Sequence, residues 1–157
     1  MDLAAAYSDA KRGEEVARLR RVLSLRAMLA TGMSQRQVAE AVGVSQPAVS
    51  QQLKFAPDLG AVHPEVLLEA AGPILKVLAE RQGYARLAVF GSVARHDAGQ
   101  GSDIDLLVEA PPGTSSFDFV RFQQLVERVL GREVDLVEYG GLKPGLDDDI
   151  RRDAVLL

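Results

Sequence analysis

Runs of apolar residues long enough for a β-strand are confined to the second half of this 157-residue chain. Three such runs occur, at 87–90, 104–108 and 134–137, and the apolar spacing of residues 119–129 predicts a helix between the last two. Strands that alternate with helices predict a small sheet covered by helices. The first 55 residues show helical periodicity alone, so we expect an α+β chain with an all-α N-terminal domain.

Capping residues divide the first half into three helices. Apolar spacing predicts a helix over 14–30, and a capping box from Ser34 to Gln37 predicts the next, which ends near Gly43. Ser45 caps a third helix over 46–54, with Pro47 in its first turn. The domains we expect are 1–55, a linker over 56–63, and 64–157. In the last domain we expect short helices over 64–71 and 73–82, interrupted at Gly72-Pro73.

Composition and charge narrow the possible functions. The chain has no cysteine and two histidines, which excludes disulfides and thiolate metal sites and disfavours a zinc site of imidazoles. We see no signal peptide or membrane-spanning segment, and expect a cytoplasmic protein without a membrane partner. Residues 1–55 carry 8 Lys+Arg against 5 Asp+Glu, and residues 56–157 carry 10 against 17, so the net charges are +3 and −7. This asymmetry indicates two parts with different partners.

Residues 35–54 resemble the helix-turn-helix of bacterial repressors of the phage-repressor type. Ala39 is small enough for two helices to approach closely, and Gly43 can take the positive φ of the turn. Several apolar residues have the spacing of a shared core: Val38, Val42, Val44, Val49 and Leu53. The resemblance predicts that a homodimer binds operator DNA; a helical hairpin used only for packing is the alternative. The residues expected to contact DNA are Arg36, Ser45, Gln46, Ser50, Gln51 and Lys54.

A Gly-Ser pair and three aspartates form the second pattern. Gly91-Ser92 follows an apolar strand, where glycine lets the backbone approach a phosphate and serine adds a hydroxyl. Asp103 and Asp105 are two apart on a strand, so both side chains point to one face, and Asp135 lies on a later strand. Three converging carboxylates repel one another unless a cation such as Mg²⁺ binds them.

Ten residues, Val93 to Ser102, separate Gly91-Ser92 from Asp103-Ile104-Asp105. This spacing resembles that of the minimal nucleotidyltransferases of the polymerase-β superfamily, and the similarity continues over most of residues 73–157. The resemblance implies a mixed sheet flanked by helices and Mg²⁺-dependent transfer from ATP. It implies Asp103, Asp105 and Asp135 as catalytic metal ligands, and Gly91 and Ser92 as nucleotide-binding residues. Arg95 is expected either to steady a phosphate or to form a surface salt bridge.

The resemblance also implies a biological role. Small nucleotidyltransferases of this kind are known mostly as antitoxins that transfer AMP to a tyrosine of a HEPN-type ribonuclease toxin. A helix-turn-helix would allow such an antitoxin to repress its own operon. Two other functions remain open: transfer of nucleotides to RNA 3′ ends, and a DNA-binding regulator that senses nucleotide without turnover. The acidic second half argues against the first and the three aspartates against the second.

Overall fold

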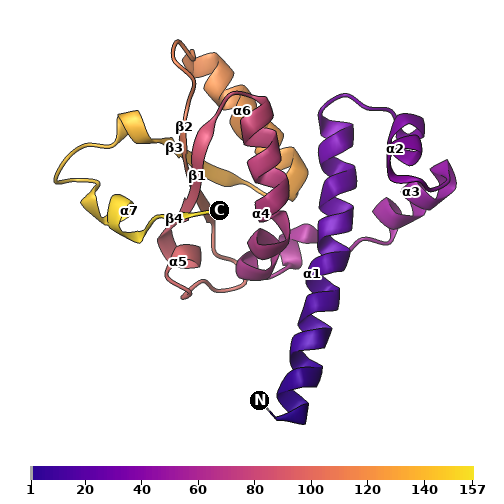
Figure 1. The fold of residues 1–157 in the computed structure, drawn as a ribbon. Helices are drawn as coiled ribbons and strands as arrows, with labels where there is room; N and C mark the ends of the chain where they lie inside the picture. Colours follow the sequence, from indigo (N-terminus) through magenta and orange to yellow (C-terminus); the bar gives the residue numbers. More distant parts are fainter. Residues whose placement is uncertain (1) are drawn as a thin grey trace.

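The structure, a computed structural model, describes residues 2–157 and confirms the α+β class (Figure 1). The elements in chain order are α1 (Leu3–Ala30), α2 (Gln35–Val42), α3 (Gln46–Lys54), the 3₁₀ turn η1 (Leu59–Ala61), α4 (Pro64–Arg81), β1 (Ala85–Phe90), α5 (Gly91–Ala94), β2 (Ile104–Glu109), α6 (Ser116–Leu130), β3 (Val134–Glu138), the 3₁₀ turn η2 (Tyr139–Gly141), α7 (Asp148–Asp153) and β4 (Val155–Leu156).

The four strands form one mixed sheet in the order β3-β2-β1-β4. β2 pairs parallel with β3 and antiparallel with β1, which also pairs antiparallel with β4. The strand β4 was not predicted, because a pair of residues is too short to show a period. β1 begins two residues earlier than its apolar run, since a register irregularity between Ala85 and Ala88 extends the pairing.

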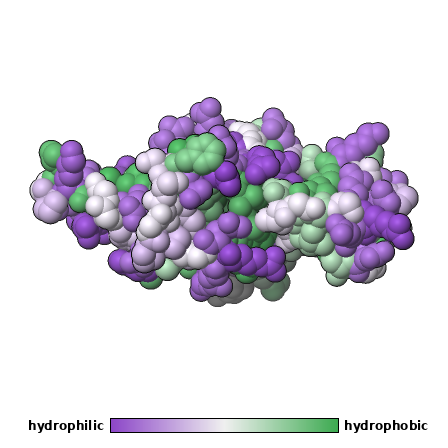
Figure 2. Space-filling model, turned by 90° about the horizontal axis from the view of Figure 1, so that it is seen from above, coloured by the Kyte–Doolittle hydropathy of each residue, from purple (hydrophilic) through white to green (hydrophobic). Residues whose placement is uncertain are grey.

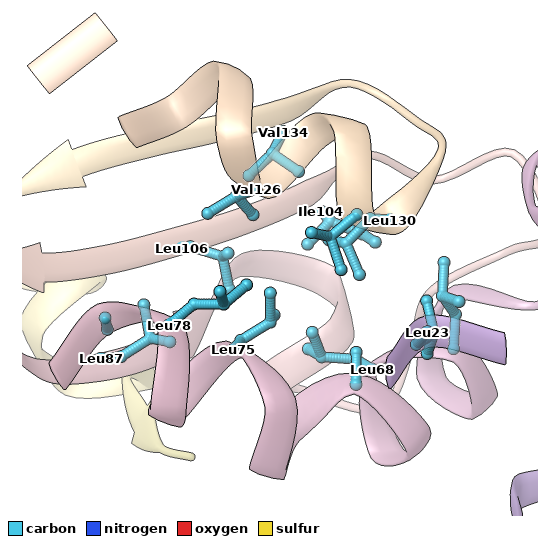
Figure 3. Close-up of a cluster of buried hydrophobic side chains, with 14 of the residues drawn as sticks. Leu23, Leu68, Leu75, Leu78, Leu87, Ile104, Leu106, Val126, Leu130 and Val134 are labelled. Carbon is cyan, nitrogen blue, oxygen red and sulfur yellow. The ribbon is translucent and has the colours of Figure 1, made fainter. Parts of the chain in front are cut away.

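Helices α4 and α6 cover one face of the sheet, and residues 139–154 lie toward the other (Figure 1). The alternation of β2 divides its side chains between these faces: Ile104, Leu106 and Val108 point into the helix-covered core, whereas Leu107 packs with Leu142 on the other face. Figure 3 shows Leu23 of α1 in the main core alongside side chains of α4, β2 and α6.

The two helices predicted within residues 35–54 are present as α2 and α3, and they share a small core of their own. Val38, Ala39 and Val49 are buried there against Leu25 of α1. The capping box at Ser34 and the left-handed Gly43 (φ 75°) are confirmed. The expectation that Val42 and Val44 fill this core is wrong: they are 43% and 39% exposed, because α2 ends at Val42 and the turn carries both outward.

Helix α1 is 28 residues long and begins at Leu3, eleven residues before the predicted start. Its first turns are rich in alanine, which favours helix without giving apolar periodicity. In Figure 1, α1 stands between α2–α3 on one side and α4 with the sheet on the other. Arg26 donates hydrogen bonds of 2.9 and 2.6 Å to the carbonyls of Val129 and Arg128, at the end of α6. Helix α1, which belongs to the first predicted domain, therefore packs against both α2–α3 and the second predicted domain.

The predicted interruption at Gly72-Pro73 is wrong, because α4 continues through Pro73. A proline inside a helix has no N–H for the carbonyl four residues earlier, here that of Glu69. Arg20 of α1 donates to that carbonyl (3.0 Å) and to that of Ala70 (3.0 Å). A side chain from another helix thus replaces the donor that proline lacks, which local sequence reasoning could not predict.

Seen from above, the molecule is elongated, with hydrophobic surface in the hollow between its two lobes (Figure 2). Within residues 2–157, no helix combines the length and the apolar character needed to span a membrane.

Candidate functional site

The predicted catalytic aspartates lie on the sheet face opposite α4 and α6. Asp105 of β2 is directly paired with Asp135 of β3 in the parallel register, and Phe90 at the end of β1 pairs with Asp105 from the other side. Asp103 precedes β2 and is exposed, as is Asp135, whereas Asp105 is half-buried. The sheet therefore places Asp105 between the Asp135 carboxylate and the turn that begins at Gly91.

Gly91 is required at this turn for two reasons. Its φ is +71°, a conformation that side-chain-bearing residues rarely adopt. A Cβ atom at this position would overlap the Oδ2 atom of Asp105 and lie 3.2 Å from its Cγ atom. The carboxylate of Asp105 therefore lies directly against the Gly91 backbone, which explains why a glycine ends this strand.

Burial, and then the neighbouring carboxylates, shift the acidity of Asp105. Its pKa is raised to about 6, mainly by burial, then by hydrogen bonding with Asp135 and repulsion from it, and to a lesser extent by repulsion from Asp103. Arg95 lowers the pKa slightly. Asp105 is thus easier to protonate than an ordinary aspartate, and it meets repulsion from its neighbours that a cation would relieve.

We expect the metal-free protein to lose stability as the pH rises from 4 to above 6. The folded pKa of Asp105 is raised, so its contribution is fully present below the unfolded value of 3.8 and is lost as the pH passes about 6. The melting temperature of Asp105→Asn relative to the unsubstituted protein, measured in EDTA, should rise over this window and then level off. A difference that stays flat from pH 4 to 8 would contradict the raised pKa.

The three predicted aspartate ligands offer oxygen donors that fit a hard divalent cation, although they do not converge on one point in this structure. Within residues 2–157, no three acidic or imidazole side chains converge in a geometry that holds a metal ion. The Asp105–Asp135 pair and the charge of Asp103, felt at Asp105, provide carboxylate oxygens, which Mg²⁺ prefers. Asp103, the third predicted ligand, is exposed and precedes β2.

The other predicted nucleotide-binding residues begin the short helix α5. Ser92 is half-buried beside Gly91, and its carbonyl accepts a hydrogen bond of 3.0 Å from the Asp97 N–H. Arg95 forms salt bridges with Asp97 (3.3 Å) and Asp153 of α7 (3.2 Å), which is the second of its two expected roles. Its contact with a phosphate stays a prediction.

Arg132 is a positioning residue that sequence reasoning missed. Its guanidinium donates to the carbonyl of Ser102 (3.1 Å), immediately before Asp103, and to that of Val62 (2.9 Å). Arg132 itself lies three residues before Asp135. Its side chain therefore links the segment that leads into β2 with the segment that leads into β3. The sequence contains one weak signal for this role: Arg132 directly follows Gly131, the residue in left-handed conformation that caps the C-terminal end of α6.

Arg132→Met should lower the unfolding free energy by about 2 kcal/mol, because two carbonyls lose a charged donor. Measured well below the melting temperature, kcat for the nucleotidyl transfer that the family resemblance implies should fall about tenfold. The reason is that the backbone leading into Asp103 is no longer held in place. Arg132→Lys, which keeps the charge but can reach one carbonyl, should be intermediate. Urea titration and initial rates give the two quantities, and an unchanged kcat in Arg132→Met would show a purely structural role.

The predicted DNA-contacting residues lie on the outer surface of α2 and α3. Arg36, Ser45, Gln46, Ser50, Gln51 and Lys54 are all exposed. The Ser45 hydroxyl caps α3 by accepting from the Ala48 N–H at 3.2 Å, and Arg36 pairs with Glu40 at 3.6 Å. A groove beside Gln51 is lined by Arg18 and Arg21 of α1, two basic residues that the helix-turn-helix pattern does not include.

Comparison with known proteins identifies the rear part of the chain. A family model described as a nucleotidyltransferase domain matches residues 73–157, and the chain belongs to this family. A putative protein adenylyltransferase of Methanocaldococcus jannaschii is 44% identical over 75 residues, covering 48% of this chain and 81% of the relative. The protein adenylyltransferase MntA of Thermococcus cleftensis is 38% identical over 80 residues, covering 51% and 81%.

A solved structure of a putative minimal nucleotidyltransferase superposes with a TM-score of 0.53 at 37% identity. It covers 66% of this chain and 99% of that one. The predicted family resemblance and small nucleotidyltransferase fold are thus confirmed.

Proposed function

We propose that this protein is an antitoxin that transfers AMP from ATP to a hydroxyl of a HEPN-type toxin. The observation that carries the proposal is the Asp105–Asp135 pair placed against the Gly91-Ser92 turn. Relatives named protein adenylyltransferases support a protein hydroxyl as the acceptor.

In the reaction, the acceptor oxygen bonds to the α-phosphorus of ATP while the bond from that phosphorus to the bridging oxygen breaks and pyrophosphate leaves. Asp103, Asp105 and Asp135 would hold Mg²⁺, which supplies charge neutralisation on the triphosphate. Asp135, which is exposed at the edge of the pair, would help to deprotonate the acceptor hydroxyl. Gly91 gives the triphosphate close access to the backbone, and Ser92 adds a hydroxyl donor.

Intact-mass measurement of the toxin after incubation with this protein, ATP and Mg²⁺ tests the proposal. We expect a gain of one AMP on a tyrosine, and none when Mg²⁺ is replaced by EDTA. Label from ATP found on RNA 3′ ends instead would support the RNA-directed alternative. Nucleotide binding with no transfer to either acceptor would support a nucleotide-sensing regulator.

We propose, as a second function, that α2 and α3 bind operator DNA. The exposed face of α3 presents Gln46, Ser50 and Gln51, and glutamine can pair with adenine through two hydrogen bonds in the major groove. Arg18 and Arg21 line the neighbouring groove, and the positive charge of these two residues supports a contact with phosphates there. The antitoxin would thereby repress its own operon.

Gln46→Ala and Gln51→Ala should each weaken operator binding by about 1–3 kcal/mol if they read bases. Arg21→Ala should weaken binding to all sequences alike and reduce its salt dependence, because phosphate contacts release counterions. Fluorescence anisotropy with the promoter and with scrambled DNA, over a range of salt, separates the two effects. Equal affinity for both DNAs at every salt concentration would refute specific recognition.

A further inference from the structure

The N-terminal part of α1 projects from the rest of the molecule. Residues 3–15 are exposed except Ala5, which is half-buried, and Leu3 and Tyr7 are 91% and 73% exposed (Figure 1). Gly13 lies within this segment and weakens its helix propensity. A Cβ atom added to Gly13 would meet nothing within 4 Å, so packing within the chain does not require the glycine. Arg12 pairs with Glu69 of α4 at 2.7 Å, while the apolar side chains of Leu3 and Tyr7 remain exposed.

An apolar groove lies on the same helix, nearer its C-terminal end. It has a volume of about 370 Å³ and runs between α1 and α4. Ala27 and Met28 line it from α1, and Val77, which is 46% exposed, lines it from α4. Arg20 and Arg81 are also part of its lining, and both are basic. The groove therefore fits an apolar helix that carries acidic residues.

We propose that this groove binds residues 3–14 of a second copy of the chain, whose own groove receives the first copy's helix. The two α1 helices then run antiparallel about a two-fold axis near Ala17. The register that places Glu14 of one copy against Arg20 of the other also places Tyr7 against Ala27 and Ala10 against Ser24. Asp2 at the helix start then lies toward Arg81, so the charges are complementary at both places.

The spacing of the two DNA-binding units supports this register, an argument that rests on the proposed DNA binding. α2 and α3 pack on α1 around Leu25, Met28, Leu29 and Met33. Met28 is eleven residues beyond Ala17, so at a rise of ~1.5 Å per residue the two units are ~33 Å apart along the pair. Half-sites one turn of B-DNA apart are separated by about 34 Å. A two-fold axis perpendicular to the plane that contains both α1 helices keeps the two copies of α2–α3 on the same side of that plane.

The oligomeric state of the full chain provides the first test. Light scattering after size exclusion, without DNA or nucleotide, should give the mass of two chains. Tyr7→Asp and Val77→Asp, which alter the helix and the groove respectively, should each shift the mass to one chain. Leu146→Asp changes an equally exposed apolar residue (77% exposed) outside both surfaces and should remain dimeric. A monomer at all concentrations, or dimers of both variants, would overturn the proposal.

The absence of cysteine allows the register itself to be tested. In Ala10→Cys/Ser24→Cys, the two introduced thiols of one chain are ~21 Å apart along the helix, too far for an internal disulfide. Each faces the other position of the second copy, so mild oxidation should convert the protein to covalent dimers. Ala10→Cys alone should stay uncrosslinked, because its two copies are also ~21 Å apart. The reverse pattern would show a different interface and refute the register.

The dimer and the DNA-binding function fail in distinguishable ways. A chain that dimerises and crosslinks as expected but binds no operator retains the interface proposed here and loses the proposed repressor role. A monomeric chain that still binds its operator specifically refutes the interface alone.

Discussion

Asp105→Asn is expected to slow AMP transfer by about 10²–10⁴-fold, because the amide keeps the side-chain shape but loses the charge that holds the cation. The same change should stabilise the metal-free protein above pH 6, since it removes the half-buried carboxylate that Asp135 and Asp103 repel. The gain is on the order of 1 kcal/mol once solvent screening of this half-buried group is taken into account. A loss of activity together with a gain in stability would show that the charge of Asp105 serves function. A charge that the fold needs would lower stability when it is removed.

Initial transfer rates and urea titrations in EDTA measure the two effects. Glu109→Gln is the matched control, because it neutralises an exposed carboxylate at the other end of the same strand. That variant should retain both activity and stability. An Asp105→Asn protein that transfers AMP at the unsubstituted rate would remove Asp105 from the site.

Gly91→Ala should remove most transfer activity and lower the unfolding free energy by about 2–3 kcal/mol. The left-handed φ of +71° contributes about 1–2 kcal/mol of this for an alanine, and displacement of the Asp105 carboxylate contributes the rest. The carboxylate that must move is the one expected to bind the cation, so a single methyl group disturbs both the turn and the metal ligands.

Gly113→Ala separates the two contributions. Gly113 has a φ of +82° but no atom within 4 Å of an added Cβ, so the substitution introduces backbone strain without a clash. We expect it to lose about 1–2 kcal/mol and to keep full transfer activity. Urea titration and initial rates of both variants give the comparison. Equal losses of activity would contradict the role assigned to the Gly91–Asp105 contact.

Local patterns in the sequence predicted the elements that local interactions determine. The capping box at Ser34, the extent of α3 and the left-handed turn at Gly43 follow from nearby residues alone, and all three are confirmed. The pairing of Asp105 with Asp135 was anticipated in outline, because alternation on apolar strands places both side chains on one face. The nucleotidyltransferase family was likewise predictable from the spacing of Gly91-Ser92 and the aspartates.

Features that depend on residues far apart in the chain were missed. The continuity of α4 through Pro73 requires Arg20, fifty residues away, to bond the carbonyls of Glu69 and Ala70. The role of Arg132 requires Ser102, thirty residues away, to lie beside it. Neither contact leaves a periodic signal. The N-terminal turns of α1 were missed for another reason, since a helix with no buried face shows no apolar period.

The position of α1 has a consequence for how the chain folds during synthesis. It is made before every other element that the structure describes, yet Arg26 bonds carbonyls 102 and 103 residues later in the chain. The apolar face of α1 is covered by Leu67, Leu68 and Leu75 of α4, which are translated well after it. The nascent helix must therefore wait with this face exposed until α4 has been made, and the bonds of Arg26 must wait until α6 has been made. Contacts of such high sequence separation slow folding, so we expect chaperones to engage the first sixty residues before the second half is complete.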